Sequence, residues 1–162
     1  MNHKYHVDLL RGGVGSPVGA WADLGCGTGA FTLALADLLD PPSVIYAVDA
    51  ERHVLETLRR RARARFPDRD IRLIHADFTQ ALDLPRLDGV VMANSLHFHR
   101  DKEPIVQSVR GLLKPARSLI LVEYNVDRGN PWVPFPISYD NWSELARRLG
   151  FASTEKIGSR PS

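Results

Sequence analysis

Short apolar runs alternate with segments of helical periodicity along almost the whole chain, and this alternation constrains the fold more than any other feature. The apolar runs are of strand length, and the segments between them carry apolar residues at helical spacing. This order is typical of βα units, in which a mostly parallel sheet has helices on both faces. We therefore expect an α/β fold, a doubly wound, Rossmann-like three-layer sandwich. Its strands are expected at residues 18–24, 44–48, 71–75, 87–93, 118–123 and, as a sixth, 152–157.

The expected helices have clear stop signals. The helix at residues 29–39 ends before a pair of prolines, and the helix at residues 51–65 ends before Pro67. Proline removes a backbone donor and restricts the residue before it, so helices usually end there. Two further helices are expected at residues 102–113 and 140–149, separated from each other by a strand and by a proline-rich loop at residues 127–136.

Length and composition indicate one globular domain. The chain has 162 residues, of which 44% are hydrophobic and 25% are charged. No apolar run approaches the length of a membrane span, and the N-terminus lacks the apolar core of a secretory signal. The single cysteine, Cys26, excludes an internal disulfide and a cysteine-based zinc site. We expect a single domain over residues 1–162, located in the cytoplasm, without a metal.

The most informative motif follows the first expected strand. Asp23 and Leu24 precede three glycines spaced by two, Gly25, Gly27 and Gly29. Glycines let the backbone approach a ligand closely, and the helix that follows presents its positive N-terminus to that ligand. The same loop also satisfies the dinucleotide pattern GxGxxG/A, so it does not by itself choose a cofactor.

Acidic residues follow the next two expected strands. Asp49 lies about 20 residues beyond the glycine loop, where an acid suits both hydroxyls of a ribose and disfavours NADP. Asp77 and Phe78 follow the third strand. A carboxylate there can accept a hydrogen bond from an adenine amino group, and the aromatic ring can cover the base.

With these three junctions, residues 18–124 resemble the class I S-adenosylmethionine-dependent methyltransferases. The resemblance implies that Asp23 and the glycine loop hold the methionine part of S-adenosylmethionine, Asp49 the ribose, and Asp77 with Phe78 the adenine. A sulfonium cofactor carries no phosphates, and the loop indeed lacks a Walker-type lysine. The expected cofactor-binding residues are Asp23, Gly25, Cys26, Gly27, Thr28, Gly29, Asp49, Ala50, Asp77, Phe78, Asn94 and Ser95.

The acceptor side is expected at the ends of the fourth and fifth strands. His97 is the candidate general base, and Tyr124 would face the same cleft as a second candidate catalytic residue. A metal held by His97 and His99 is the weaker interpretation, because no carboxylate clearly completes the set. Arg128, Trp132 and Phe135 form either an acceptor wall or ordinary loop packing.

The leading hypothesis is methyl transfer by in-line displacement to an unidentified, small-molecule acceptor. An NAD-dependent oxidoreductase is the alternative enzyme, and a non-catalytic cofactor-binding or scaffold protein is the alternative outside enzymes. The end of the fourth expected strand lacks the Asn/Asp-Pro-Pro-Tyr/Phe signature of nucleic-acid enzymes that methylate amino groups. S-adenosylmethionine is thus the expected cofactor, and a homo-oligomer remains open.

Three segments have two interpretations each. The basic run of Arg59, Arg60, Arg61, Arg63 and Arg65 suits either a nucleic-acid contact or a solvated helix end. Residues 1–13 form either a lid helix over the cofactor or a frayed terminus. The family's seventh strand is absent, so we expect either a truncated copy or a six-stranded sheet with an exposed edge.

Overall fold

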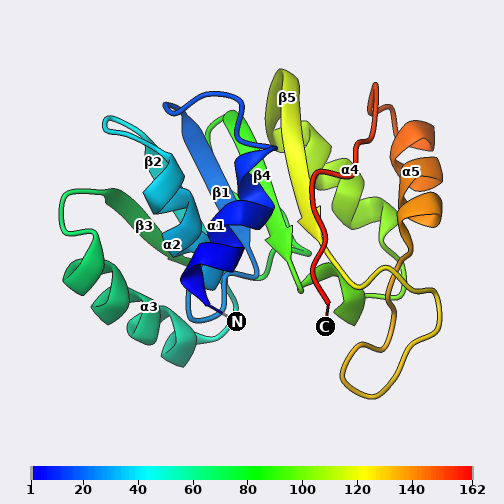
Figure 1. Cartoon of the computed structure of the whole chain (residues 1–162), viewed down its shortest axis with the longest axis horizontal. Helices are drawn as coiled ribbons and strands as arrows, with labels where there is room; N and C mark the ends of the chain where they lie inside the picture. Colours follow the sequence, from blue (N-terminus) through cyan, green and yellow to red (C-terminus); the bar gives the residue numbers. More distant parts are fainter. Residues whose placement is uncertain (1, 162) are drawn as a thin grey trace.

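A parallel sheet of five strands runs through the middle of the protein (Figure 1). The structure is a computed structural model that describes residues 2–161. The strand order is β3-β2-β1-β4-β5, and every neighbouring pair is parallel. The order reverses between β1 and β4, which places the ligand crevice of such a sheet at the carboxyl ends of these strands. The strands are β1 (Ala20–Leu24), β2 (Val44–Asp49), β3 (Asp70–His75), β4 (Leu87–Ala93) and β5 (Leu113–Val122).

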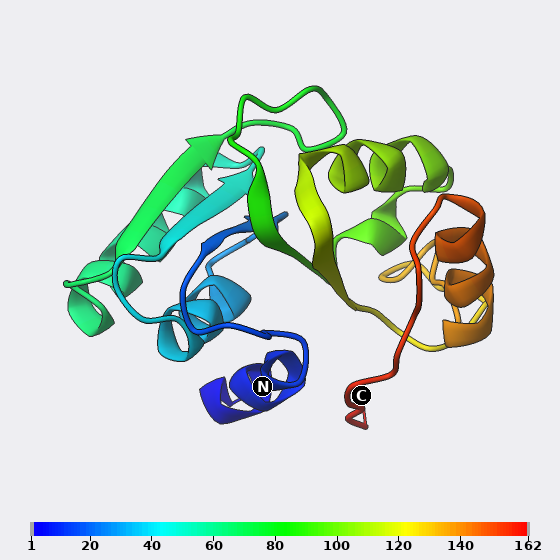
Figure 2. The same cartoon turned by 90° about the horizontal axis from the view of Figure 1, so that it is seen from above.

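Helices cover both faces of the sheet, which confirms the predicted three layers (Figure 2). One face packs against α1, α2 and α3, and the other packs against α4 and α5. Alternate strand residues serve the two layers: Ile45 and Ala47 belong to the first layer's core, and Val48 belongs to the second. The helices are α1 (His3–Arg11), α2 (Ala30–Leu38), α3 (Arg52–Arg65), α4 (Glu103–Leu112) and α5 (Tyr139–Arg148), with a short 3-10 turn η1 (Leu96–Phe98).

The predicted elements are confirmed, mostly to within one or two residues at each end, apart from the last two strands. The prediction of β5 began at residue 118, whereas the strand begins at Leu113. Its pairing with β4 shifts register between Leu113 and Ser118, and Ala116 adopts a positive φ of 57° there. The irregular start explains why the apolar pattern revealed only the second half of this strand.

The predicted sixth strand at residues 152–157 is wrong. These residues form no regular element, and within the described residues β5 pairs with β4 alone. The segment has few apolar residues, and it finds other partners. Tyr139 Oη donates to the carbonyl of Thr154 at 3.2 Å, and Ile157 lies against Gly12 and Gly13 at the end of α1.

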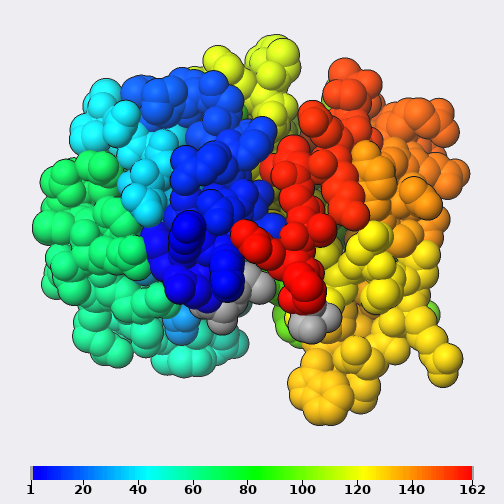
Figure 3. Space-filling view, in the orientation of Figure 1, coloured from blue at the N-terminus to red at the C-terminus, as the bar shows by residue number. Residues whose placement is uncertain are grey.

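The first helix and the last segment lie side by side (Figures 1 and 3). Arg160 pairs with Asp8 at 3.4 Å and lies over the ring of Tyr5 at 4.6 Å. In α1, Val7 and Leu10 are buried in the core shared with α2. Residues 3–11 are therefore helical rather than frayed, and the role of this helix as a lid stays a prediction. Among residues 2–161, no helix combines the length and the apolar character that a membrane span requires.

Candidate active site

The glycine loop folds across the carboxyl ends of β1 and β2. The backbone N–H groups of Gly25 and Cys26 both donate to the carbonyl of Val48, at 2.9 and 3.0 Å. Gly27 and Gly29 have positive φ angles of 52° and 89°. A Cβ at Gly29 would overlap Leu58 of α3, whereas the space beside Gly27 is open. The loop is thus packed at its base and accessible at its tip.

Asp49 ties the end of β2 to this loop. Its Oδ2 accepts a hydrogen bond from the Gly27 N–H at 2.8 Å, and its Oδ1 accepts from the Glu51 N–H at 2.9 Å. Each oxygen therefore retains acceptor capacity for a second donor. The neighbouring Ala50 is exposed, and its carbonyl oxygen lies 2.8 Å from Nε2 of His75. The arrangement fixes a carboxylate beside the accessible tip of the loop.

Asp23 is a buried acid beneath the loop. Its carboxyl is 1% exposed and accepts a hydrogen bond from Thr32 Oγ1 at 2.7 Å. Burial raises the pKa of Asp23 to about 7, against the opposing effect of the Thr32 hydrogen bond. Burial also raises the pKa of the Cys26 thiol well above its ordinary value, which leaves a protonated, poor nucleophile.

The third and fourth junctions meet the glycine loop. A Cβ at Gly25 would lie 2.6 Å from Ser95 Cβ and 3.1 Å from a ring atom of Phe78. Ser95 Oγ donates to the carbonyl of Leu24 at 2.9 Å. Asn94 adopts a positive φ of 53°, and its side chain is exposed. The predicted residues of four strands are thereby brought to one edge of the sheet.

Asp77 lies at the exposed rim of this edge. Its Oδ1 accepts from the N–H and the hydroxyl of Thr79, at 2.9 and 2.7 Å. These hydrogen bonds hold the pKa of Asp77 below its ordinary value, so the group stays ionised near neutral pH. The neighbouring Phe78 ring meets His99 edge-on, with centroids 5.3 Å apart.

One arginine of the basic run serves the loop itself. Arg61 donates to the carbonyl of Thr28 at 2.7 Å and lies 3.3 Å from its hydroxyl. Arg59 pairs with Glu56 on its own helix at 3.5 Å. Part of the basic run thus has structural partners, and a nucleic-acid contact by this face stays a prediction.

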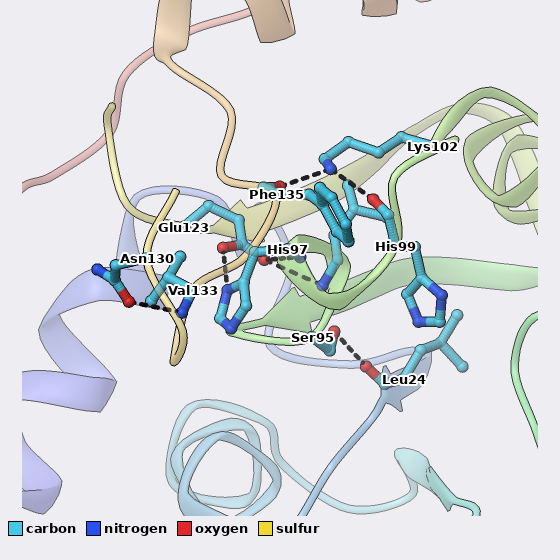
Figure 4. A network of polar contacts seen from close by, with 10 residues as sticks. Leu24, Ser95, His97, His99, Lys102, Glu123, Asn130, Val133 and Phe135 are labelled. Atoms are coloured by element: carbon cyan, nitrogen blue, oxygen red, sulfur yellow. Dashed lines mark hydrogen bonds and ion pairs between the residues drawn. The ribbon is translucent and has the colours of Figure 1, made fainter. Parts of the chain in front are cut away.

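A buried pair of hydrogen-bonded side chains lies at the ends of β4 and β5 (Figure 4). Nδ1 of His97 is 2.6 Å from Oε2 of Glu123, and both side chains are 4% exposed. The other carboxylate oxygen accepts the backbone N–H groups of Leu96 and His97, at 3.0 and 3.1 Å. Glu123 is thus held at both oxygens, and it fixes the ring of His97.

A second buried charge secures the proline-rich loop. The ammonium group of Lys102 donates to the carbonyls of His99 and Phe135, each at 2.7 Å, and the side chain is largely buried (Figure 4). The Phe135 N–H donates to the carbonyl of His97 at 2.9 Å. Burial lowers the pKa of Lys102. The loop is thereby attached to the segment that carries the candidate base.

The other acceptor-side candidates lie around this pair. Tyr124 is 40% exposed, with its ring centroid 5.8 Å from that of His97. Trp132 is 80% exposed, and Arg128 is also exposed. The ring of Phe135 lies under Arg100 at 4.9 Å. Within residues 2–161, no three His, Cys, Asp or Glu side chains are grouped as a metal site.

Sequence reasoning places Glu123 at the end of the fifth strand, facing the cleft, but it missed the pairing of Glu123 with His97 and the role of Lys102 as the anchor of the loop. A signal for the pairing was present, because β4 and β5 are adjacent and an acid directly follows β5. No local pattern distinguishes Lys102 from a solvated lysine at a helix start.

Known proteins resemble this chain in sequence and in fold. Residues 22–116, more than half of the chain, match the family described as "Methyltransferase domain". A 2-phytyl-1,4-naphtoquinone methyltransferase of Trichormus variabilis is 31% identical over 107 residues, which cover 64% of this chain and 45% of that protein. An uncharacterized methyltransferase of Mycobacterium bovis is 33% identical over 127 residues, covering 76% of this chain and 60% of that protein.

The chain thus spans about half the length of these relatives. A solved structure of magnesium protoporphyrin IX methyltransferase from Synechocystis, with bound S-adenosylmethionine, superposes with a TM-score of 0.73. It is 18% identical, and the match covers 95% of this chain and 73% of that one. On the family match, the chain belongs to the class I S-adenosylmethionine-dependent methyltransferases.

Proposed function

We propose that this protein binds S-adenosylmethionine and transfers its methyl group to a small-molecule acceptor. One observation carries the proposal: the glycine loop, Asp49 and the Phe78–Ser95 pair converge at the switch point of the sheet. The link between Gly27 and Asp49 at 2.8 Å joins the first two junctions, and Gly25 touches the third and fourth.

The residues at this edge fit a cationic cofactor without phosphates. Gly27 leaves open space at the tip of the loop, where a side chain would intrude. Asp49, and Asp23 in its ionised form, would supply negative charge to a cationic ligand. In this proposal Asp23 and residues 25–29 hold the methionine part, Asp49 with Ala50 the ribose, and Asp77 with Phe78 the adenine. Asn94 and Ser95 would contact the cofactor from the end of β4.

The mechanism is an in-line displacement. S-adenosylmethionine supplies an activated methyl group when it is bound. The protein's part is to orient the acceptor and to exclude water, and positioning of this kind can account for most of the acceleration. His97 removes a proton from the acceptor where the acceptor must lose one, and Tyr124 lies beside it.

The acceptor class is supported by the relatives. The similar protein of Trichormus variabilis is a 2-phytyl-1,4-naphtoquinone methyltransferase, and the solved structure from Synechocystis is a magnesium protoporphyrin IX methyltransferase, names that point to small-molecule acceptors. We extend this class to the present chain as a proposal. A cytoplasmic location and a homo-oligomer stay predictions from the sequence.

The experiment is a calorimetric titration with S-adenosylmethionine, S-adenosylhomocysteine and NAD in parallel. We expect micromolar binding of the first two. Asp49→Ala should weaken both by about 1.5–3 kcal/mol, more than tenfold, because a hydrogen bond to a charged group is lost. Asp68→Ala, which removes an exposed acid paired with Arg69, is the matched control and should bind normally. Binding of NAD alone would indicate an oxidoreductase instead.

A further inference from the structure

We propose that Glu123 is a positioning residue that holds His97 as a general base, and that the acceptor therefore carries a weakly acidic hydroxyl group. This inference rests on the proposed function, and it names the acceptor's reacting group.

The first step concerns the tautomer of His97. A carboxylate only accepts hydrogen bonds, and Oε2 of Glu123 lies 2.6 Å from Nδ1 of His97. Nδ1 must therefore carry the ring proton. The backbone N–H groups of Leu96 and His97 bind the other carboxylate oxygen, so the carboxylate cannot turn away.

The second step concerns the opposite nitrogen. With Nδ1 protonated, Nε2 of the neutral ring is the proton acceptor. Nε2 has no hydrogen-bond partner among residues 2–161. It is nevertheless not one of the fully buried side-chain atoms that lack a partner, so it is accessible to a ligand. Figure 4 shows that it points away from Glu123. The rings of Phe98 and Tyr124 lie beside the His97 ring, with centroids 4.4 and 5.8 Å from its own.

The third step concerns which acceptors need such a base. A phenolic hydroxyl ionises near pH 10 and is a weak nucleophile at neutral pH, whereas a thiol ionises near pH 8.5. A neutral amine attacks with its own lone pair and releases its proton afterwards. A fixed, uncharged imidazole acceptor therefore benefits a hydroxyl attached to an aromatic ring or an enol most.

The reaction balances with these groups. The acceptor's O–H proton passes to Nε2 of His97, and an oxygen lone pair forms the new bond to the methyl carbon. The bond between that carbon and sulfur breaks with its electrons on sulfur, which yields a neutral thioether. The imidazolium that forms is stabilised by Glu123 and later returns its proton to solvent.

The tautomer is measured by NMR on protein labelled with nitrogen-15 in its histidines, with His97→Gln identifying the His97 signals. We expect Nδ1 protonated and Nε2 bare at pH 8. Glu123→Gln keeps an oxygen for the two backbone N–H groups but removes the charge, and it should disturb this state. A ring protonated at Nε2 in the wild-type protein would overturn the proposal.

The acceptor class is tested with two ring-matched probes, 1-naphthol and 1-naphthylamine, each with S-adenosylmethionine and mass-spectrometric detection. We expect methylation of the naphthol, and a kcat at least 100-fold lower in His97→Gln and Glu123→Gln with KM within threefold. Preference for the amine, or a naphthol rate that survives His97→Gln, contradicts the proposal. No turnover of either probe, together with no change at Nε2 when 1-naphthol is added, also contradicts it.

Calorimetry on the same samples distinguishes a failure of the proposed role of Glu123 from a failure of the proposed methyltransferase function. Normal binding of S-adenosylmethionine with the wrong tautomer refutes only the role of the pair formed by His97 and Glu123. The expected tautomer without cofactor binding refutes the methyltransferase function. Thermal unfolding of both variants shows whether they fold.

Discussion

The two halves of the site are built in different ways. The half at the ends of β1 and β2 is made largely of backbone, with loop N–H groups donating to Val48 and to Asp49. The half at the ends of β4 and β5 is made of buried polar side chains, namely His97, Glu123 and Lys102. The glycine loop of the first half is a contiguous sequence motif, whereas the second half depends on residues brought together from three segments.

This difference separates stability from function. Gly25 and Gly29 in the first half are fixed by close approach, so substitutions there should affect folding. Buried charges in the second half are costly to desolvate, and Lys102 has only carbonyl partners within hydrogen-bond distance among the described residues. We infer that the second half sacrifices stability to hold a particular geometry.

The largest effect is expected at Gly29. Gly29→Ala should lower the free energy of unfolding by about 3 kcal/mol, because a left-handed backbone carries strain and the new Cβ overlaps Leu58. Gly27 also has a positive φ, but the space beside it is open, so Gly27→Ala should lower the free energy of unfolding by only about 1 kcal/mol. Urea unfolding of both variants measures the difference. Equal losses would show that packing under the loop is unimportant.

A smaller effect of the opposite kind is expected at Lys102. Lys102→Met shortens the side chain by one heavy atom and removes its charge, so the cost of burying the ammonium group disappears and stability should stay equal or rise. The loop at residues 127–136 should become more mobile. Hydrogen exchange of the Phe135 amide should accelerate about tenfold, because the hydrogen bonds from Lys102 to the carbonyls of His99 and Phe135 are lost.

The matched control for this variant is Lys114→Met, which removes an exposed lysine paired with Asp88 at 3.2 Å. It should leave exchange in the loop unchanged. If Lys102→Met unfolds the protein, or leaves the exchange of the Phe135 amide unaltered, the hydrogen bonds of Lys102 do not have the proposed role in positioning the loop.

The same contrast explains what could be predicted from the sequence. The strand β4 was predicted at its observed bounds, and the glycine loop, Asp49 and Phe78 were expected to meet. Buried strands and glycine loops have local patterns, since apolar runs and turn residues follow from neighbouring positions. The convergence of these side chains at one edge then follows from parallel topology alone.

The remainder depended on contacts distant in sequence. Glu123 lies 26 positions from His97, and Phe135 lies 33 positions from Lys102. The predicted sixth strand failed for a related reason. Its pattern allowed a strand, but Ile157 packs against Gly13 and Thr154 accepts from Tyr139, contacts that no local rule indicates.

The smallest effect is expected from the titration of Asp23. Burial raises the pKa of this carboxyl to about 7, so the native protein holds a proton that the unfolded chain releases at lower pH. The stability contributed by this group is therefore present at low pH and is lost as the pH rises from about 4 to 7. A cationic ligand reverses the preference, because it favours the ionised carboxylate.

Cofactor affinity should therefore rise with pH. The ionised fraction of Asp23 increases from about one tenth at pH 6 to about nine tenths at pH 8, so the apparent Kd of S-adenosylhomocysteine should fall by up to about tenfold over this range. Calorimetry at several pH values measures it, and Asp23→Asn isolates this group from the titration of the ligand itself. A slope that persists unchanged in Asp23→Asn would assign the pH dependence elsewhere. If the pH dependence of the Kd disappears in Asp23→Asn, the half of the site at the ends of β1 and β2, though built largely of backbone, also relies on one buried charge. The bound ligand would then supply the partner of that charge.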